Sequence, residues 1–491
     1  MTRLPSIPLG FQAFRSGDAR KLIPWAIAAG FLSLSLADLS IALLFAVVAC
    51  VSLFVLALHD LSFGVLAIAA SVPVQSFASI DLSFVDLTWT KLAVLATLAA
   101  WTVRVAAGYS RPIFDGLAAA LGCYVLVLAI SVIEARSVSA WAEEIYRWAV
   151  ALAVYLIAIE SMRSNRTVKR VVLVVAGAVL ALSTLAAWQV ITGAGPATFS
   201  VGGITRAYGT FGEPNPFAGY LEMTVLLLVA VALGAMARGS RWAIQTRLGK
   251  ATIVAAVVAS VVGTVTLLAT QSRGGYLGFA VGVGIAVWLT GGRVRWLGTV
   301  GGGICLVAVL VSPFGEDISA RFRGEALTTS ETQVTTENFA AQERSAHWRA
   351  AVSMAESSPI FGVGAGNFDQ RYREYTNVWR FRIPRGHAHS AYLQALAQAG
   401  GVGLLSYLTL FAVVTRKIGA ALRRANDPVS RSVVIGVAAV SAAVAVHNTV
   451  EYLHVLSLGL QLSLIWALLS IDGHNWTGTT PDHHGPLVTA S

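Results

Sequence analysis

Long apolar runs dominate this chain, and short polar connections separate them. From Leu22 to Leu469, stretches of roughly 15 to 22 mostly apolar residues recur, each close to the ~20 residues with which an α-helix crosses a hydrocarbon core of about 30 Å. A water-soluble fold could not bury so many helices of this kind. The pattern therefore predicts an all-α integral membrane protein.

The apolar pattern predicts about 12–14 transmembrane helices. Twelve spans result if a pair of early helices merges or drops out. The His59–Asp60 connection is the weakest boundary between these helices. The expected spans are Leu22–Ala37, Ile41–Leu58, Ser62–Phe77, Trp89–Ala106, Leu117–Ile133, Ile145–Met162, Val171–Ile191, Phe217–Ala237, Thr252–Leu268, Tyr276–Leu289, Trp296–Val311, Tyr392–Val414, Val433–Val446 and Leu453–Leu469.

Composition and charge agree with a membrane protein. Only 12% of the 491 residues are charged and 56% are hydrophobic, whereas about 25% of a soluble domain is charged. The net charge of +10 lies in short basic clusters between apolar runs, which argues against a nucleic-acid-binding face. These clusters follow the even-numbered spans, as at Arg163–Arg170 and Arg416–Arg431. The positive-inside rule then predicts cytoplasmic termini.

One long polar stretch, residues 312–390, interrupts the apolar pattern and is expected outside the cytoplasm. Its Thr-rich part, Thr328–Gln342, is expected to be flexible. The next part, Glu343–Ser357, places Trp348, Ala351, Val352 and Ala355 at helical spacing, which predicts an amphipathic helix on the membrane or against the bundle. The predicted division is N-terminal helices 1–199, central helices 200–311, loop 312–390, C-terminal helices 391–471 and cytoplasmic tail 472–491.

Candidate chemistry begins with the segment R-A-Y-G-T-F-G-E-P-N-P-F-A that starts at Arg206. Its glycines and prolines force an irregular backbone, which survives at membrane depth only if it is buried in protein or lines a wet cavity. We expect Arg206, Tyr208 and Asn215 to bind substrate there, and Glu213 to be an alternative base or acceptor-positioning group. The competing interpretation is an ordinary turn that starts a helix at Asn215.

A second arginine, Arg273, lies between two apolar runs at the outer boundary, followed by two glycines that allow close approach. An arginine near hydrocarbon costs a few kcal/mol unless it finds an anion or reaches the interface. It either binds an anionic ligand or extends to lipid phosphates.

The long loop ends in a third group of candidates, which includes Arg344, His387 and His389. The glycine run Gly362–Gly366 is not a GxGxxG motif and predicts no nucleotide site. The H-x-H pair has no carboxylate or cysteine nearby in the sequence, so it is weak evidence for a metal. A neutral imidazole at a helix entrance suits a general base better.

His447 and Glu451 stand at i and i+4 past the thirteenth expected span. We expect them to pair as a tie between helices, or to support the site from behind.

The expected topology brings Arg206, Arg273 and His389 to the same outer side, around one loop. Two guanidinium groups can bind a diphosphate through charge-assisted, often bidentate hydrogen bonds. A nearby histidine can accept the proton of an attacking hydroxyl. These are the parts needed to transfer a sugar from a lipid diphosphate to an alcohol without a metal or another cofactor.

The motifs R-A-Y-G-T-F-G-E-P-N-P-F-A, S-R-G-G, R-x3-W, G-V-G-x-G-x-F and H-x-H-S-x-Y-L-Q, over roughly residues 200 to 410, resemble the O-antigen ligase and polymerase superfamily. The resemblance implies a GT-C-like membrane glycosyltransferase that uses an undecaprenyl-diphosphate-linked glycan on the periplasmic face of the bacterial inner membrane and inverts the anomeric carbon. Arg206 and Arg273 match the diphosphate-binding arginines and His389 the proposed base. Ser390 stands where the family often has Asn, and His387 could compete as base.

The resemblance leaves the acceptor open. Lipid A core would make the chain a ligase, a growing polysaccharide a polymerase, and a Ser or Thr side chain a protein oligosaccharyltransferase. From other classes, a polytopic transporter would place ionisable residues at the bilayer midplane, and a membrane scaffold would leave the arginines without a task.

Overall fold

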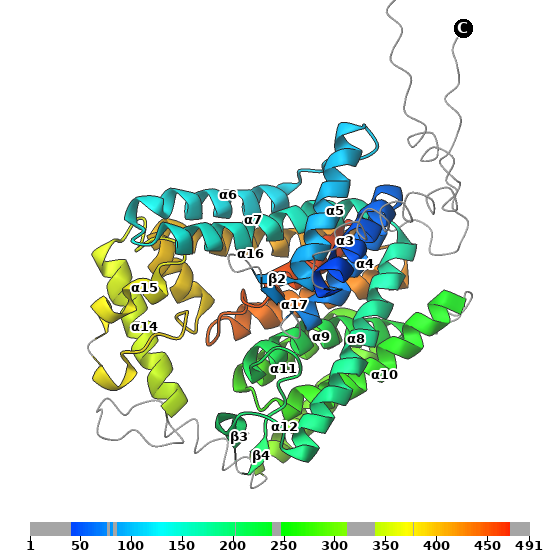
Figure 1. Ribbon diagram of the computed structural model, residues 1–491. Coiled ribbons are helices and arrows are strands. Elements are labelled where there is room, and N and C mark those ends of the chain that lie inside the picture. The colour runs from blue at the N-terminus through cyan, green and yellow to red at the C-terminus, as the bar shows by residue number, and fades with distance from the viewer. Residues whose placement is uncertain are drawn as a thin grey trace, which may run out of the picture.

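The computed structural model describes residues 41–75, 79–81, 86–201, 203–237, 247–311, 339–376 and 378–471. Regular structure in these residues is almost entirely helical (Figure 1). The exceptions are two short antiparallel hairpins, β1 (Ser79–Asp81) with β2 (Asp86–Thr88) and β3 (Ser200–Val201) with β4 (Ile204–Thr205). The all-α membrane class is confirmed.

Every expected span from Ile41 onward falls on a helix, and the first one, Leu22–Ala37, lies outside the described residues. Within the described residues, seven helices are long and apolar enough to cross a bilayer, and shorter apolar helices occur at Leu43–His59, Leu61–Val74 and Leu458–Ser470. The helices at the expected spans are α3 (Ile41–His59), α4 (Leu61–Ser71), α5 (Trp89–Ala106), α6 (Gly116–Ile130), α7 (Val138–Ser161), α8 (Asn165–Thr192), α9 (Pro214–Ala237), α10 (Arg247–Ala269), α11 (Arg273–Thr290), α12 (Gly292–Val311), α16 (Ala391–Arg424), α17 (Pro428–His447) and α18 (Leu458–Ala467).

The weakest predicted boundary, at His59–Asp60, is a true helix break. The Asp60 side chain accepts the backbone N–H of Ser62 at 2.9 Å and so caps the start of α4. The merged form of these early helices is therefore wrong, and α3 and α4 are separate elements.

Side-chain caps also start the two helices that carry candidate residues. Ser272 Oγ accepts the backbone N–H of Gly275 at 3.4 Å, which starts α11 at Arg273. Ser390 Oγ accepts the backbone N–H of Leu393 at 3.4 Å, which starts α16 directly after His389. Both candidates thus lie at a helix entrance, where the backbone changes direction.

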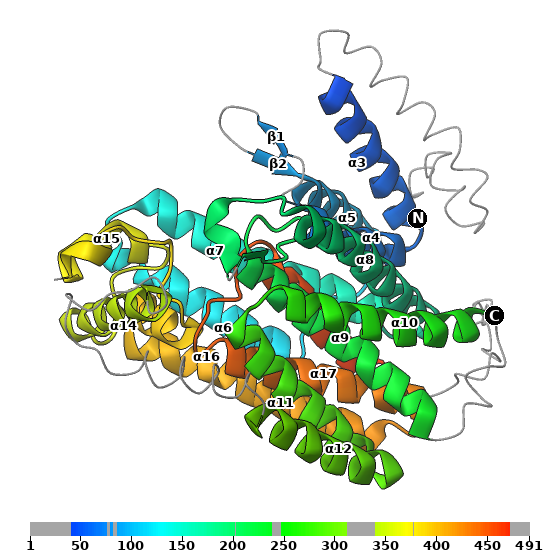
Figure 2. The same ribbon diagram turned by 90° about the horizontal axis from the view of Figure 1, so that it is seen from below.

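Helix α9 lies inside the bundle and packs against α10, α11 and α17 (Figure 2). Its apolar window is 89% buried. Gly278 of α11 allows the close approach, because an added Cβ would lie 2.6 Å from Glu222 Oε1 and 2.9 Å from the Ala443 carbonyl. Small residues at a helix interface are a common way to bring membrane helices together.

The long loop carries α14 (Phe339–Ser357), α15 (Phe368–Tyr375) and the short 3-10 helix η6 (Trp379–Phe381). Figure 1 shows α14 and α15 together at one end of the bundle. Helix α14 contains the predicted amphipathic segment and packs against α16. The predicted face was partly wrong, since Val352 is exposed, while Ala346, His347 and Met354 are buried with Ala351. Residues 328–338 of the predicted flexible part lie outside the described residues.

The glycine run of the loop docks its backbone on the bundle. Gly364 and Gly366 have φ of 93° and 71°. A Cβ on Gly364 would collide with the backbone of Ala135, just before α7, and one on Gly366 with the backbone of the first turn of α7. The backbone N–H of Val363 donates to the Ala397 carbonyl at 2.8 Å, and that of Gly401 donates to Pro359 at 2.7 Å. These bonds span a break in α16, where Ala399 and Gly400 leave helical geometry.

Candidate active site

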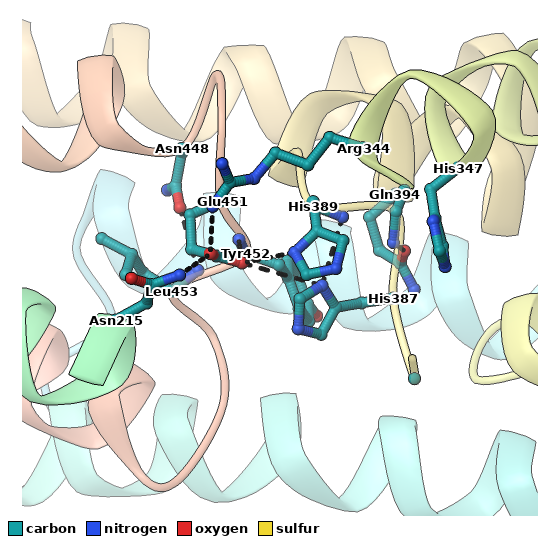
Figure 3. A network of polar contacts seen from close by, with 12 residues as sticks. Asn215, Arg344, His347, His387, His389, Gln394, Asn448, Glu451, Tyr452 and Leu453 are labelled. Atoms are coloured by element: carbon teal, nitrogen blue, oxygen red, sulfur yellow. Dashed lines mark hydrogen bonds and ion pairs between the residues drawn. The ribbon is translucent and has the colours of Figure 1, made fainter. Parts of the chain in front are cut away.

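A single buried carboxylate, Glu451, lies between α17 and α18 at the centre of a polar network (Figure 3). Its two oxygens face different partners. Oε1 accepts hydrogen bonds from His389 Nδ1 at 3.1 Å and from the backbone N–H of Tyr452 at 3.1 Å. Oε2 accepts one from Asn215 Nδ2 at 2.9 Å and lies 3.6 Å from Arg344 Nη2.

The loop that carries the histidines is held from both sides. His389 has a φ of 51°, a left-handed conformation that is uncommon for a residue other than glycine. Trp348 Nε1 donates to the His389 carbonyl at 3.2 Å, and the buried Gln394 Oε1 accepts the backbone N–H of Ala388 at 2.7 Å. Helices α14 and α16 therefore fix the direction of the His389 ring.

His389 presents one nitrogen to the site. Because Nδ1 donates to Glu451, the neutral ring carries its proton there and leaves a lone pair on Nε2. In the described part of the chain, no group hydrogen-bonds this buried Nε2. An acceptor hydroxyl that enters the site can supply the missing partner.

The pKa shifts of His387 and Glu451 indicate the charge states of these two groups. Burial lowers the pKa of His387 to about 4, so this ring is neutral. Burial alone would raise the pKa of Glu451, but the hydrogen bond from His389 and the charge of Arg344 hold it well below its usual range. An ionised Glu451 next to Nδ1–H favours a protonated His389 after the ring accepts a proton.

Arg206 is linked to Glu451 through Asn215, in the first turn of α9. Asn215 Oδ1 accepts a hydrogen bond from Arg206 Nη2 at 3.0 Å. Arg206 Nε donates to the carbonyl of Thr270 at 2.8 Å, three residues before Arg273 starts α11. A continuous hydrogen-bonded path therefore joins Arg206, Asn215, Glu451 and His389, although these residues are far apart in the sequence.

Three guanidinium groups gather on this side of the site. Burial lowers the pKa of Arg206, and the positive charges of Arg344 and Arg273 lower it further. Arg273 is exposed on the first turn of α11, where the helix dipole also favours an anion. Repulsion among the three groups would be relieved by a polyanion such as a diphosphate.

Two expected substrate-binding residues stand outside the network. The Tyr208 ring packs on Phe199, with ring centroids 5.3 Å apart, and its backbone N–H donates to Gln189. The side chain of Glu213 is exposed, on the turn that precedes α9. Glu451 occupies the position in the network for which Glu213 had been considered.

The predicted pairing of His447 with Glu451 is wrong. His447 Nδ1 instead lies 2.7 Å from Glu222 Oε2, across the interface of α17 with α9. After α17 ends at His447, the chain no longer continues as a helix, so the i and i+4 spacing does not bring the two side chains together.

The segment with Glu451 is also anchored to α7, which the sequence did not indicate. Tyr452 Oη donates to Glu144 Oε1 at 2.8 Å, and Trp148 Nε1 donates to the same oxygen at 3.1 Å. Arg147 Nη1 donates to the other oxygen of Glu144 at 2.6 Å. This buried carboxylate thus fixes the backbone next to Glu451.

His347 is a further residue that sequence analysis missed. Its ring stacks on Tyr372 at 4.6 Å and meets the His389 ring edge-on at 5.3 Å. The only available signal was its place three residues after Arg344, on the same face of α14.

Residues 255–408 match the family model described as O-antigen ligase, Wzy_C. The match confirms the predicted O-antigen ligase and polymerase superfamily and supports activity of that general type, with a lipid-linked glycan donor. It includes Arg273, Arg344, His387 and His389, whereas Arg206, Asn215 and Glu451 lie outside it. A search of curated proteins finds no match.

Proposed function

We propose, because residues 255–408 match the O-antigen ligase family model, that this chain is a glycosyltransferase that moves an undecaprenyl-diphosphate-linked glycan onto an acceptor hydroxyl. The reaction takes place on the periplasmic face of the bacterial inner membrane. The observation that carries the proposal is the hydrogen-bonded path from Arg206 through Asn215 and Glu451 to His389. It places an anion-binding group and a base at the two ends of one network.

The base in this reaction is His389. Its free Nε2 accepts the proton of the acceptor hydroxyl as the oxygen attacks the anomeric carbon. Glu451 holds the proton on Nδ1 and stabilises the imidazolium that forms, the part that a carboxylate plays beside a histidine in hydrolases. Attack from the face opposite the diphosphate inverts the anomeric carbon.

The leaving group is the lipid diphosphate. As the bond between the anomeric carbon and the phosphate oxygen breaks, negative charge grows on that oxygen. Arg206 and Arg273 stabilise this charge, and Arg344 adds a third positive group from α14. The arginines thereby have the role that a divalent cation has in many reactions with a phosphate leaving group.

The acceptor decides the subclass. Lipid A core makes the protein a ligase, and the end of a growing glycan makes it a polymerase. We favour the ligase reaction and keep the polymerase reaction of the same superfamily as the alternative.

The test is transfer from a synthetic undecaprenyl-diphosphate glycan by purified protein in EDTA, with lipid A core, a glycan and a Ser/Thr peptide as acceptors. Wild type is compared with Arg206→Ala, Arg273→Ala and His389→Ala, and with Arg111→Ala as control, since Arg111 is exposed on the connection from α5 to α6. We expect transfer by wild type and the control, and its loss in the other three.

Donor binding, measured in parallel, separates the possible failures. Loss of binding in the two arginine variants but not in His389→Ala supports the assigned roles. Absence of both transfer and donor binding in wild type would contradict the proposal and favour a transporter.

A further inference from the structure

The sequence offered the H-x-H pair no carboxylate, but the fold supplies one. One ring nitrogen of His387, one of His389 and a carboxylate oxygen of Glu451 lie within 4.8 Å of one another. In the described part of the chain, this is the one group of three such side chains with that spacing. Glu451 Oε1 lies 3.1 Å from His389 Nδ1 and 3.9 Å from His387 Nδ1, so it faces both rings.

Two hydrogen-bond acceptors of this group face each other with no proton between them. His387 Nδ1 accepts the backbone N–H of His389 at 3.2 Å, so this nitrogen carries a lone pair. The lone pair and the Glu451 oxygen are both acceptors, and they lie 3.9 Å apart. A cation between them would replace the hydrogen bond at His387 Nδ1 and would have a favourable contact with both acceptors.

We propose that His387, His389 and Glu451 bind a zinc ion that inhibits the enzyme. Two imidazole nitrogens and one carboxylate oxygen are a ligand set that Zn²⁺ accepts, and the fourth position stays open to the site. Zn–ligand bonds of about 2.0–2.2 Å require the three atoms to draw closer together. Both rings are partly accessible, with 18% and 16% of the side chains exposed.

Inhibition follows from the nitrogen that the ion would use, and this step rests on the proposed function. Zn²⁺ on His389 Nδ1 displaces the proton from that atom, and the neutral ring then carries its proton on Nε2. The lone pair that would accept the proton of the acceptor hydroxyl is no longer available. The ion also occupies the carboxylate that would stabilise the imidazolium. The bound ion therefore switches transfer off and plays no part in the reaction itself.

The primary test is binding of ZnCl₂ to the full-length, tag-free protein in detergent, measured by titration calorimetry. We expect one saturable site, with affinity reduced at least about tenfold in His387→Ala and in Glu451→Gln, since even the loss of an outer-shell partner costs a metal that much. His59→Ala is the matched control, because His59 lies at the end of α3, and it should bind as wild type does. No saturable binding, or equal affinity in all variants, would overturn the proposal.

A second measurement needs no variant and so does not depend on folding of the mutants. Zn²⁺ should protect His387 and His389 of the wild-type protein from modification by diethyl pyrocarbonate, as detected by mass spectrometry of the peptides. Unchanged modification of both residues at saturating Zn²⁺ would contradict the site.

Transfer assays then connect the site to the reaction. We expect Zn²⁺ to suppress transfer by wild type and EDTA to restore it. Zinc binding without any transfer would keep the site and contradict the proposed function, whereas transfer without zinc binding would do the reverse.

Discussion

At the scale of single residues, Glu451 decides how the site works, because it faces both halves of the reaction. Its Oε1 side holds the base, and its Oε2 side holds Asn215 and Arg344. A buried carboxylate of this kind is costly unless every oxygen has partners, and here hydrogen bonds and an ion pair supply them. Substitution of Glu451 should therefore affect turnover more than donor binding.

We expect Glu451→Gln to lower kcat on the order of 10²-fold, the contribution typical of a general base, because an amide cannot stabilise imidazolium on His389. KM for the donor should change little. Transfer kinetics of Glu451→Gln and Glu213→Gln decide between the two carboxylates. A large loss in the exposed Glu213→Gln and a small one in Glu451→Gln would reverse the assignment.

Arg206→Lys keeps the positive charge but removes the fork that contacts both Thr270 and Asn215. Since lysine does not replace a bidentate arginine, we expect donor affinity to fall about tenfold, equivalent to about 1.4 kcal/mol. Equilibrium binding of the lipid diphosphate measures this. Arg111→Lys is the matched control, and an equal loss in both variants would argue against a specific role for Arg206.

The sequence singled out Arg206 and His389, which one hydrogen-bonded path joins in the structure, but it did not indicate how they are connected. Arg206, Asn215 and His389 were identifiable because polar residues at the ends of apolar runs are conspicuous. Glu451 was assigned to His447, its neighbour in the sequence, because helical spacing is the only distance that a sequence gives directly. The real partners, Glu222 for His447 and His389 for Glu451, lie 225 and 62 residues away and depend on which helices pack together.

At the scale of elements, the interface of α9, α11 and α17 positions the arginine end of the site. Gly278 of α11 lies against Glu222, and Gly274, next to Arg273, lies against His447. The glycines of α11 therefore set how deeply its first turn enters the bundle.

Two glycines of α11 provide a matched test of this packing. A Cβ at Gly278 would lie 2.6 Å from Glu222 Oε1, whereas one at Gly284 meets nothing within 4 Å. We expect Gly278→Ala to destabilise the protein by about 1–3 kcal/mol through overpacking. Gly284→Ala should be neutral or stabilise it by up to about 1 kcal/mol. Thermal unfolding in detergent measures both, and similar Tm values for the two variants would contradict close packing at Gly278.

The hydrophobicity of the sequence predicts where helices lie, but it does not predict which helices contact one another. Apolar length identifies a span, so each expected span from Ile41 onward overlaps a helix, although the last one starts at Leu453, before α18 begins at Leu458. The buried face of α14 was predicted less well, because Val352 is apolar but exposed, while Ala350, Ala351 and Met354 pack in one cluster with Ala397 of α16. Hydrophobicity alone does not reveal which side of such a helix faces its neighbour.

At the scale of the whole molecule, the proposed orientation places the loop outside and the basic connections inside. Cysteine labelling tests it in a background without Cys50, Cys123 and Cys305. Arg380→Cys, in exposed η6, should react with a membrane-impermeant maleimide in intact spheroplasts. Arg166→Cys, exposed at the start of α8, should react only after permeabilisation. The opposite pattern would invert the topology and place the site in the cytoplasm.

The break in α16 has a consequence for how substrates arrive. Its freed backbone groups are paired with the loop, since the N–H of Gly401 donates to the Pro359 carbonyl and the Ala397 carbonyl accepts the N–H of Val363. Unpaired groups at membrane depth are costly. This part of the loop is therefore a fixed wall and not a lid, and hydrogen exchange should find these amides as protected as those of α16 itself. A lipid-linked donor would then reach the arginines by lateral entry from the bilayer, without any opening of that wall.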